Sequence, residues 1–363
     1  MESCITSPVH NPAPAKEVLP ASSSGGGNST ALDQWRGLAL VFVLISHGFF
    51  FTGRVYGMGR VGVNLFFFIS GVLVFRSLSR TRANSSWAIT RSFWKRRARR
   101  LYPAMAAYVL AMLPISLAVQ HWLGGPDAEL GRYLRTVPFA LLYAVNYWPF
   151  GSVSLGHLWS LSCEMQFYLL APAIFLAGGR TARRRHLVWG TLLLALIASG
   201  LVGAMLAGSA FDKHQAFRYH FEVAVWPMML GFYCEYQKDR FRRLLMNWSP
   251  AIKGLSVVAL GAIIALGLIG LKMKMLVVAV GMFVLVPCFL AYVAEKPMGG
   301  AVGRALAWMG ERTYSIYLWQ EPLTVCGYLP AAWQSAGAAV SLFVGGAWFR
   351  LFERPFLSAR RKH

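Results

Sequence analysis

Acidic side chains are scarce in this sequence, which has 14 Asp and Glu residues against 36 Lys and Arg residues. A formal charge of +22 is compatible with nucleic-acid binding, but the basic residues occur in short clusters between long apolar segments. That alternation is typical of the cytoplasmic loops of membrane proteins. We therefore expect no nucleic-acid partner.

Cysteine is also rare, and four of the five cysteines lie in or beside apolar segments: Cys163, Cys234, Cys288 and Cys326. The fifth, Cys4, lies in a polar tail. Their spacing matches neither a metal site nor a disulfide framework, so we expect no metal ion and no disulfide.

Apolar side chains are few in residues 1–32, which end near the polar run SSSGGGNST. Such a segment cannot bury enough apolar surface to fold, and we predict a disordered tail. The opening residues MESCITSPVH lack a basic region followed by an apolar one, so no cleaved signal peptide is expected. Residues 33–363 are expected to form one membrane domain.

Hydrophobic residues are abundant instead, at 56% of the chain against 14% charged residues. This composition is too apolar for a soluble domain of this size, and repeated apolar runs near 20 residues predict an all-α, polytopic integral membrane protein. We place ten spans near 35–51, 61–79, 101–119, 157–177, 187–208, 219–237, 251–270, 275–294, 313–330 and 333–352. The apolar segment 133–150 carries prolines and arginines and is expected to be a re-entrant or surface element at the outer face.

The basic residues also predict an orientation. With 133–150 outside the membrane, 28 of the 36 Lys and Arg residues fall on one side, together with both termini. Cytoplasmic loops carry such an excess, so both termini are predicted to be cytoplasmic. We expect a multi-pass protein of the cell (inner) membrane.

The first apolar segment, WRGLALVFVLISHGFFF from Trp35 to Phe51, contains one ionisable residue besides Arg36, namely His47. Eleven helical positions place Arg36 and His47 on nearly the same face, about 16 Å apart along the axis. A polar side chain in hydrocarbon is costly, so His47 is a candidate catalytic residue. The alternative is that His47 only forms a hydrogen bond to a neighbouring helix.

A second buried candidate is Glu164, in the segment HLWSLSCEMQFYLLAP. It lies seven residues from the outer end of its predicted span, about 10 Å deep, so its depth nearly matches that of His47. A carboxylate that fixes the tautomer of His47 would make the imidazole a better general base. A purely structural contact between the two side chains is the alternative.

The densest basic cluster is FWKRRARRLYP, from Phe93 to Pro103. Cytoplasmic loops are commonly basic, and this alone accounts for most such clusters. Arg97 and Arg100, however, are three residues apart on one helical face, and paired guanidinium groups suit the binding of phosphates. A phosphate-rich cytoplasmic ligand is therefore a second interpretation.

Several other polar and small residues interrupt the apolar segments. Gly62 and the Ser70–Gly71 pair are expected to let helix backbones approach closely. Near the C-terminus, carboxylates and tyrosines are expected close to the inner face as interface anchors or ion-pair partners of arginines. These residues are Glu311, Tyr314, Tyr317, Glu321 and Glu353.

Taken in order, these motifs resemble those of the membrane-bound acyltransferase 3 family. The matching elements are Arg36 with His47 eleven positions later, GVNLFFFISG, RRARRLYP, LWSLSCEMQFYL, TYSIYLWQEP and the closing FERP. They cover the chain from about residue 33 to its end. In two places the sequence departs from the family pattern, because Asn64 stands where relatives commonly have Asp and Gln320 where they commonly have His.

The resemblance implies a membrane-bound O-acyltransferase with about ten transmembrane helices. It implies that an acyl-CoA donor, by analogy acetyl-CoA, arrives from the cytoplasm, with no permanently bound cofactor. The acceptor would be a hydroxyl of a carbohydrate or glycolipid, with polysaccharide assembly enzymes as partners. By the same analogy, His47 is the catalytic base, Arg36 supports the site, and Glu164 matches the family's acidic position. Arg97 and Arg100 match its basic pair, which is expected to bind the donor.

Two other function classes stay open at this point. A transporter or flippase for an anionic glycan or lipid precursor would also have many spans and buried ionisable residues. An inactive scaffold within a polysaccharide assembly complex is the other alternative.

Overall fold

The computed structural model describes residues 27–48, 56–81, 85–122, 128–148, 152, 154–206, 219–246, 296–324 and 334–358. These residues form helices and connecting turns, and the described part contains no strand. The first half comprises α1 (Gly27–Gly48), α2 (Tyr56–Ser79), α3 (Ser86–Trp122), α4 (Ala128–Leu141), η2 (Val145–Tyr147), η3 (Gly156–Leu158), α5 (Trp159–Ala177) and α6 (Ala182–Leu206). The second half comprises α7 (Phe221–Ala224), α8 (Trp226–Tyr236), α9 (Lys238–Met246), α12 (Gly300–Glu311), α13 (Thr313–Thr324), α14 (Gln334–Trp348), η6 (Phe349–Glu353) and α15 (Arg354–Ser358).

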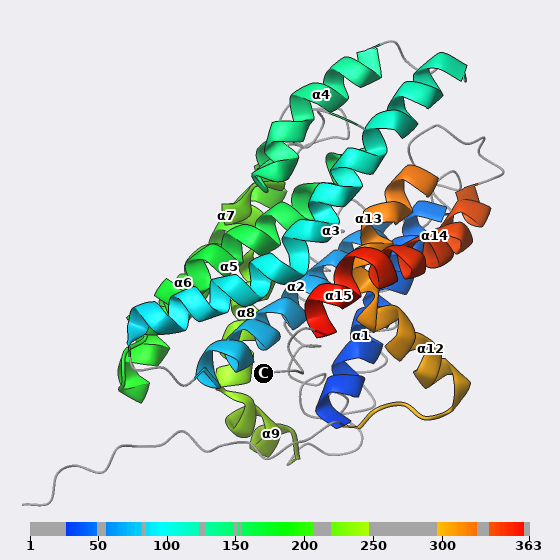
Figure 1. Cartoon of the computed structure of the whole chain (residues 1–363). Helices are drawn as coiled ribbons and strands as arrows, with labels where there is room; N and C mark the ends of the chain where they lie inside the picture. The colour runs from blue at the N-terminus through cyan, green and yellow to red at the C-terminus, as the bar shows by residue number, and fades with distance from the viewer. Residues whose placement is uncertain are drawn as a thin grey trace, which may run out of the picture.

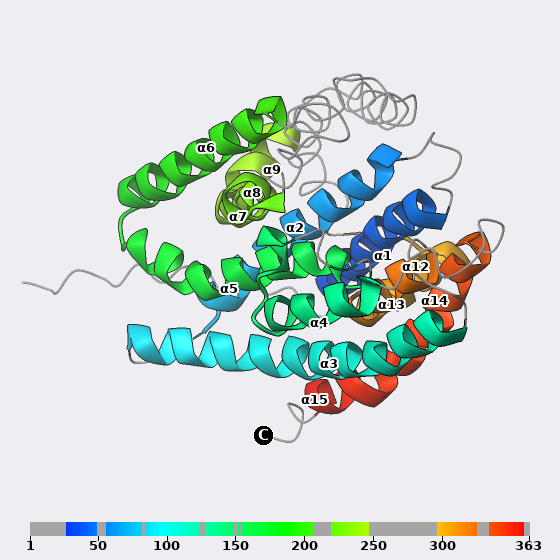
Figure 2. The ribbon, with the colours of Figure 1, turned by 90° about the horizontal axis from the view of Figure 1, so that it is seen from above.

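Helix α2 lies in the middle of the described bundle and packs against α1 on one side and α8 on the other (Figures 1 and 2). Its contact with α8 depends on two glycines. A Cβ atom added to Gly71 would lie 1.9 Å from the carbonyl oxygen of Met228, and one added to Gly231 would lie 2.0 Å from that of Phe68. Gly62 lets α1 approach closely in the same way, because an added Cβ atom would lie 2.5 Å from the carbonyl oxygen of Ala39. The predicted small-residue packing at Gly62 and Gly71 is confirmed.

Helix α3 is the longest of the described elements, with 37 residues and two internal prolines, Pro103 and Pro114. It begins at Ser86, well before the predicted span 101–119, so the basic cluster lies within the helix. The helix ends beside α4, at the upper end of the molecule in Figure 1. An α-helix can continue through the basic cluster because arginine and lysine are good helix formers.

The segment 133–150 does not form one continuous helix. Helix α4 has 14 residues and ends at Leu141, short of the roughly 20 that cross a bilayer. Tyr143 has a positive φ of 52°, and a 3₁₀ turn, η2, follows. These bounds agree with a surface or re-entrant element, and residues 149 and 150 lie outside the described part.

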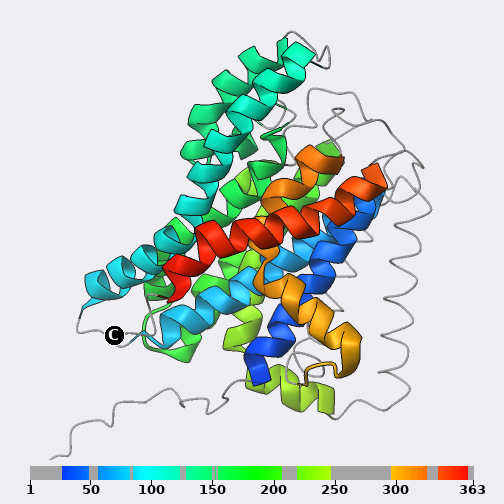
Figure 3. The same ribbon diagram turned by 45° about the vertical axis from the view of Figure 1, so that its right-hand side comes forward.

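The C-terminal helices pack against the N-terminal one. Helix α12 contacts α1, and α14 lies across both α13 and α1 (Figure 3). Gln34 ties the start of α1 to this region, because its Nε2 donates to the carbonyl oxygens of Met298 (2.8 Å) and Gly303 (3.1 Å). Helices α1, α12, α13 and α14, far apart in sequence, thus build one wall of the bundle.

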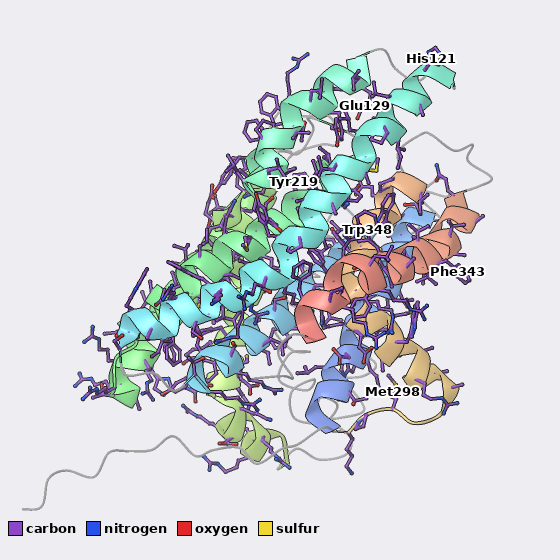
Figure 4. All side chains as sticks on the ribbon, in the orientation of Figure 1. His121, Glu129, Tyr219, Met298, Phe343 and Trp348 are labelled. Carbon is purple, nitrogen blue, oxygen red and sulfur yellow. The ribbon has the colours of Figure 1, made fainter. Side chains whose placement is uncertain are left out.

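Five described helical segments are long and apolar enough to cross a membrane, namely Gly59–Ser79, Ser86–Ala118, Gly156–Ala177, Ala182–Gly203 and Gln334–Phe356. Large apolar side chains on α6 and α14 face outward, and Phe343 on α14 is 79% exposed (Figure 4). Trp348, five residues further on, instead packs on Trp319. An outward apolar face of this kind suits contact with lipid.

Not every predicted span corresponds to one helix. The span 219–237 is divided between α7 and α8 at Val225, two residues before Pro227, which lies in the first turn of α8. Helix α13 covers the first part of the span 313–330. The spans 251–270 and 275–294 lie outside the described residues.

Candidate functional site

Helices α1, α2, α3, α5 and α13 surround a cavity in the described bundle. Its polar lining residues are Arg36, Ser70, Arg97, Arg100, Ser160, Glu164, Tyr168, Thr313, Tyr314 and Tyr317. Four of the five residues that the sequence singled out for the site, all except His47, therefore converge on this cavity. Three guanidinium groups around one carboxylate make it a candidate site for an anionic ligand.

The three arginines are held in different ways. Arg36 lies 3.7 Å from the carboxylate of Asp33, one turn earlier in α1. Arg100 lies 3.6 Å from Oε1 of Glu353, a fully buried carboxylate in η6 that also accepts a hydrogen bond from Ser315 (2.9 Å). The predicted ion pairing of Glu353 with an arginine is confirmed.

Arg97 is held by aromatic rings. Its guanidinium carbon lies 4.7 Å from the ring centre of Tyr168 and 5.4 Å from that of Phe93. In the described part of the chain no carboxylate forms an ion pair with Arg97. A cation fixed over aromatic faces keeps its charge available to an incoming anion.

Glu164 faces the arginines from α5. It accepts short hydrogen bonds from the hydroxyl groups of Ser70 and Tyr168. Tyr168 is fixed in turn through its carbonyl oxygen, which accepts a hydrogen bond from the indole of Trp94 (3.1 Å). That oxygen is free because Pro172, four residues later, has no N–H to donate to it.

His47 lies elsewhere, in the last described turn of α1. Its Nδ1 lies 2.5 Å from Oε1 of Gln320 in α13. An amide oxygen can only accept, so Nδ1 carries the proton and Nε2 of the neutral imidazole is left as a base. Gln320 was given no role from the sequence, yet it is the residue that fixes the tautomer of His47.

The structure does not bring Glu164 and His47 together, and in the described part of the chain no hydrogen bond joins them. The predicted contact relied on counting residues from the start of each apolar segment, and helix α1 does not begin where its apolar segment begins. Helix α1 begins at Gly27, before the apolar segment that opens at Trp35, and His47 lies next to its last described residue, Gly48. The neighbour of His47 on the fourth span is His157, about 10 Å along the chain from Glu164.

Helix α13 links the two places. Tyr314 and Tyr317 line the cavity, and Gln320 follows three residues later at His47. The hydroxyl of Tyr317 lies 2.8 Å from that of Ser160, and that of Tyr314 donates to the carbonyl of Leu101 (2.8 Å). One side of α13 is therefore polar at every turn from the arginine cavity to His47.

Comparisons with known proteins agree with this arrangement. A family model described as an acyltransferase domain matches residues 29–349. A "Putative O-acetyltransferase" of Staphylococcus aureus (strain COL) is 24% identical over 357 residues, which cover 90% of this chain and 56% of that protein. A "Putative peptidoglycan O-acetyltransferase" of Bacillus subtilis (strain 168) is 27% identical over 322 residues, covering 81% and 48%.

The O-acetyltransferase OatA of Staphylococcus aureus (strain NCTC 8325 / PS 47) is 29% identical over 181 residues, which cover 47% of this chain and 28% of that protein. The first two relatives match most of this chain, but the chain spans only about half of the length of each of them. No solved structure matches it. Because the family model covers nearly the whole chain, the protein belongs to the acyltransferase 3 family and is an enzyme that transfers acyl groups.

Proposed function

We propose that the protein is a multi-pass O-acyltransferase of the cell (inner) membrane that moves an acyl group, by analogy acetyl, from cytoplasmic acyl-CoA to a carbohydrate or glycolipid hydroxyl. The observation that carries this proposal is the joint lining of one cavity by Arg36, Arg97 and Arg100, which α13 connects to His47. Phosphates would bind at one end of this path and the base would act at the other.

The donor end is the arginine cavity. Arg97 would bind a phosphate of coenzyme A directly, because its guanidinium is held by aromatic rings and, among the described residues, by no carboxylate. Arg36 and Arg100 would orient the phosphates from their fixed positions beside Asp33 and Glu353. Glu164 would shape the cavity through Ser70 and Tyr168 and would not act on His47.

The pantetheine arm of the donor would follow α13 past Tyr314 and Tyr317. Arg36 and His47 are eleven residues apart on α1, or about 16 Å, and an extended pantetheine chain can bridge a separation of this order. The thioester would then lie beside His47, at the end of α1 where the acceptor would arrive from the outer side.

His47 would act as general base. Its Nε2 would take the proton of the acceptor hydroxyl while that oxygen attacks the thioester carbonyl. The carbon–sulfur bond would break, and the leaving thiolate would take the proton back from the imidazolium, so no proton is gained or lost overall. Gln320 would keep Nδ1 protonated and the ring oriented throughout.

Names of relatives support the class of acceptor. One relative is named for O-acetylation of peptidoglycan, so a glycan hydroxyl is the acceptor that we propose for this chain. Polysaccharide assembly enzymes would be its partners in the membrane.

The proposal is tested with purified protein in detergent, acetyl-CoA labelled in the acetyl group, and a panel of glycan and glycolipid acceptors. We expect label in an acceptor ester that mild alkali releases. Membrane vesicles that carry the protein and take up labelled glycan without acetylating it would instead support the transport alternative.

A further inference from the structure

A second polar pair lies beside the proposed base, and the proposed function does not use it. Nδ1 of His157, in η3 at the start of the fourth span, faces Oε2 of Glu321 in α13 at 3.6 Å. The side chain of His157 is 1% exposed and that of Glu321 is 18% exposed. Glu321 was expected near the inner face, but the structure places it with His157, about 12 Å along α13 from Thr313.

The tautomer of His157 follows from a proline. Pro322 lies within α13 and has no N–H, so the carbonyl oxygen of Leu318, four residues earlier, lacks its helical donor. Nε2 of His157 lies 3.1 Å from that oxygen and must be the donor, because a carbonyl only accepts. The neutral ring therefore presents a bare Nδ1 to Glu321.

That arrangement requires a proton between the two side chains. In the described part of the chain Nδ1 of His157 is buried without a hydrogen-bond partner, and no lysine or arginine forms an ion pair with Glu321. An ionised carboxylate facing a lone pair in a buried site would be costly, whereas a neutral carboxylic acid can donate to Nδ1. At 3.6 Å the two atoms are farther apart than in a formed hydrogen bond, so the donation requires the side chains to approach by about half an ångström.

The pair also fixes the part of α13 that touches the base. Glu321 directly follows Gln320, whose Oε1 accepts a hydrogen bond from Nδ1 of His47. Leu318, whose carbonyl accepts from His157, lies two residues before Gln320. Tyr317 adds a further link, because its hydroxyl donates to the carbonyl oxygen of His157 (3.4 Å). Any movement of α13 relative to His157 would move the amide of Gln320 relative to His47.

We propose that Glu321 is a neutral carboxylic acid that donates to His157, and that this pair is a positioning device which holds Gln320 on His47. The titratable groups that face the pair are His47 from α1, Tyr108 from α3 and Tyr317 from α13. Loss of the shared proton at alkaline pH would break the contact and reduce turnover. This consequence for turnover rests on the proposed acyl transfer.

Two substitutions distinguish the effect of losing the donated proton from the effect of changing the size of the side chain. In Glu321→Gln an amide N–H replaces the acid as donor to His157, so we expect kcat near the wild-type value and a weaker decline at alkaline pH. In Glu321→Met the donor is lost, so we expect kcat to fall about tenfold, the effect of one misplaced hydrogen bond, with the KM for acetyl-CoA unchanged. A wild-type kcat for the methionine variant, or an unchanged alkaline decline for the glutamine variant, would overturn the proposal.

Infrared spectroscopy tests the proton without any assay of activity. We expect a carboxylic-acid carbonyl stretch in the wild-type protein at neutral pH, shifted in D₂O, which disappears in Glu321→Gln and persists in the control Glu222→Gln. If the band is present but no acetyl transfer occurs, the pair stands and the proposed function fails. If Glu321→Gln removes no such band, Glu321 is ionised and the proposed pair is wrong.

Discussion

Nδ1 of His47 lies 2.5 Å from Oε1 of Gln320, across the interface between helices α1 and α13. This contact leaves Nε2 as the basic atom of the neutral ring. A Cβ atom added to Gly59 would lie 3.9 Å from Nε2, so a residue without a side chain borders the imidazole from α2. The base is thus fixed through its Nδ1 atom, and its other nitrogen borders a glycine.

Replacement of Gln320 tests the orientation of the base. Gln320→Leu removes the acceptor for Nδ1 while roughly keeping the volume, and we expect kcat to fall about tenfold because the tautomer is no longer fixed. Gln320→Glu keeps an acceptor oxygen at the same place and should retain most of the activity. Steady-state kinetics of the two purified variants decide this, and equal activities would contradict the assigned contact.

Replacement of His47 tests the base itself. We expect His47→Ala to lower kcat about 10²–10⁴-fold, the usual contribution of general-base catalysis, with little change in acetyl-CoA binding. His121→Ala, at an exposed histidine near the end of α3, is the matched control and should behave as wild type. A His47→Ala protein that inserts, folds and acetylates normally would falsify the assignment.

Part of the site could be predicted from local sequence. Arg97 and Arg100 are three apart in one helix, so their shared direction follows from the helical period, and the structure places both in the cavity. Gly62 and Gly71 were predicted as contact points of helix backbones, and both are. Both features could be predicted because they depend on the spacing or the size of residues within one helix.

The relative heights of side chains on neighbouring helices could not be predicted in the same way. The expected contact of Glu164 with His47 assumed that each helix begins at the membrane surface where its apolar segment begins. Helices α1 and α3 begin several residues earlier, so Glu164 faces Arg36, Arg97 and Arg100. A one-turn error moves a side chain about 5 Å, which is enough to change its partner.

Two contacts escaped the sequence analysis although a signal was present. Pro172 and Pro322 each free the carbonyl four residues earlier, and Trp94 and His157 donate to those oxygens. A proline within a helix predicts an unpaired carbonyl four residues earlier, so the positions of both carbonyls could be derived from the sequence. The donor to each carbonyl could not be derived in this way, because it lies on another helix.

The three arginines of the cavity should differ in their response to substitution. Arg97→Gln should raise the KM for acetyl-CoA with little loss of stability, because Arg97 lies over aromatic rings and forms no ion pair with a carboxylate in the described part of the chain. Arg100→Gln should lower the melting temperature in detergent, because it leaves the buried carboxylate of Glu353 without its cation. The double variant Arg100→Gln, Glu353→Gln should recover part of that stability. Equal effects of the two single variants on both measurements would contradict the different roles.

The α2–α8 contact sets the position of Ser70, which donates to Glu164, and it can be tested at Gly71. In Gly71→Ala the new Cβ would meet the carbonyl oxygen of Met228 at 1.9 Å, so the helices must separate, at a cost of about 1–3 kcal/mol typical of overpacking. Gly190→Ala in α6 is the control, since its nearest heavy atom would lie 4.0 Å away. Alanine is the better helix former, so the control should unfold at the wild-type temperature or above it. Tryptophan fluorescence during heating measures the melting temperature of both variants. Because separation of the helices also displaces Ser70, Gly71→Ala should lose acetyl transfer even below its melting temperature, whereas Gly190→Ala should keep it.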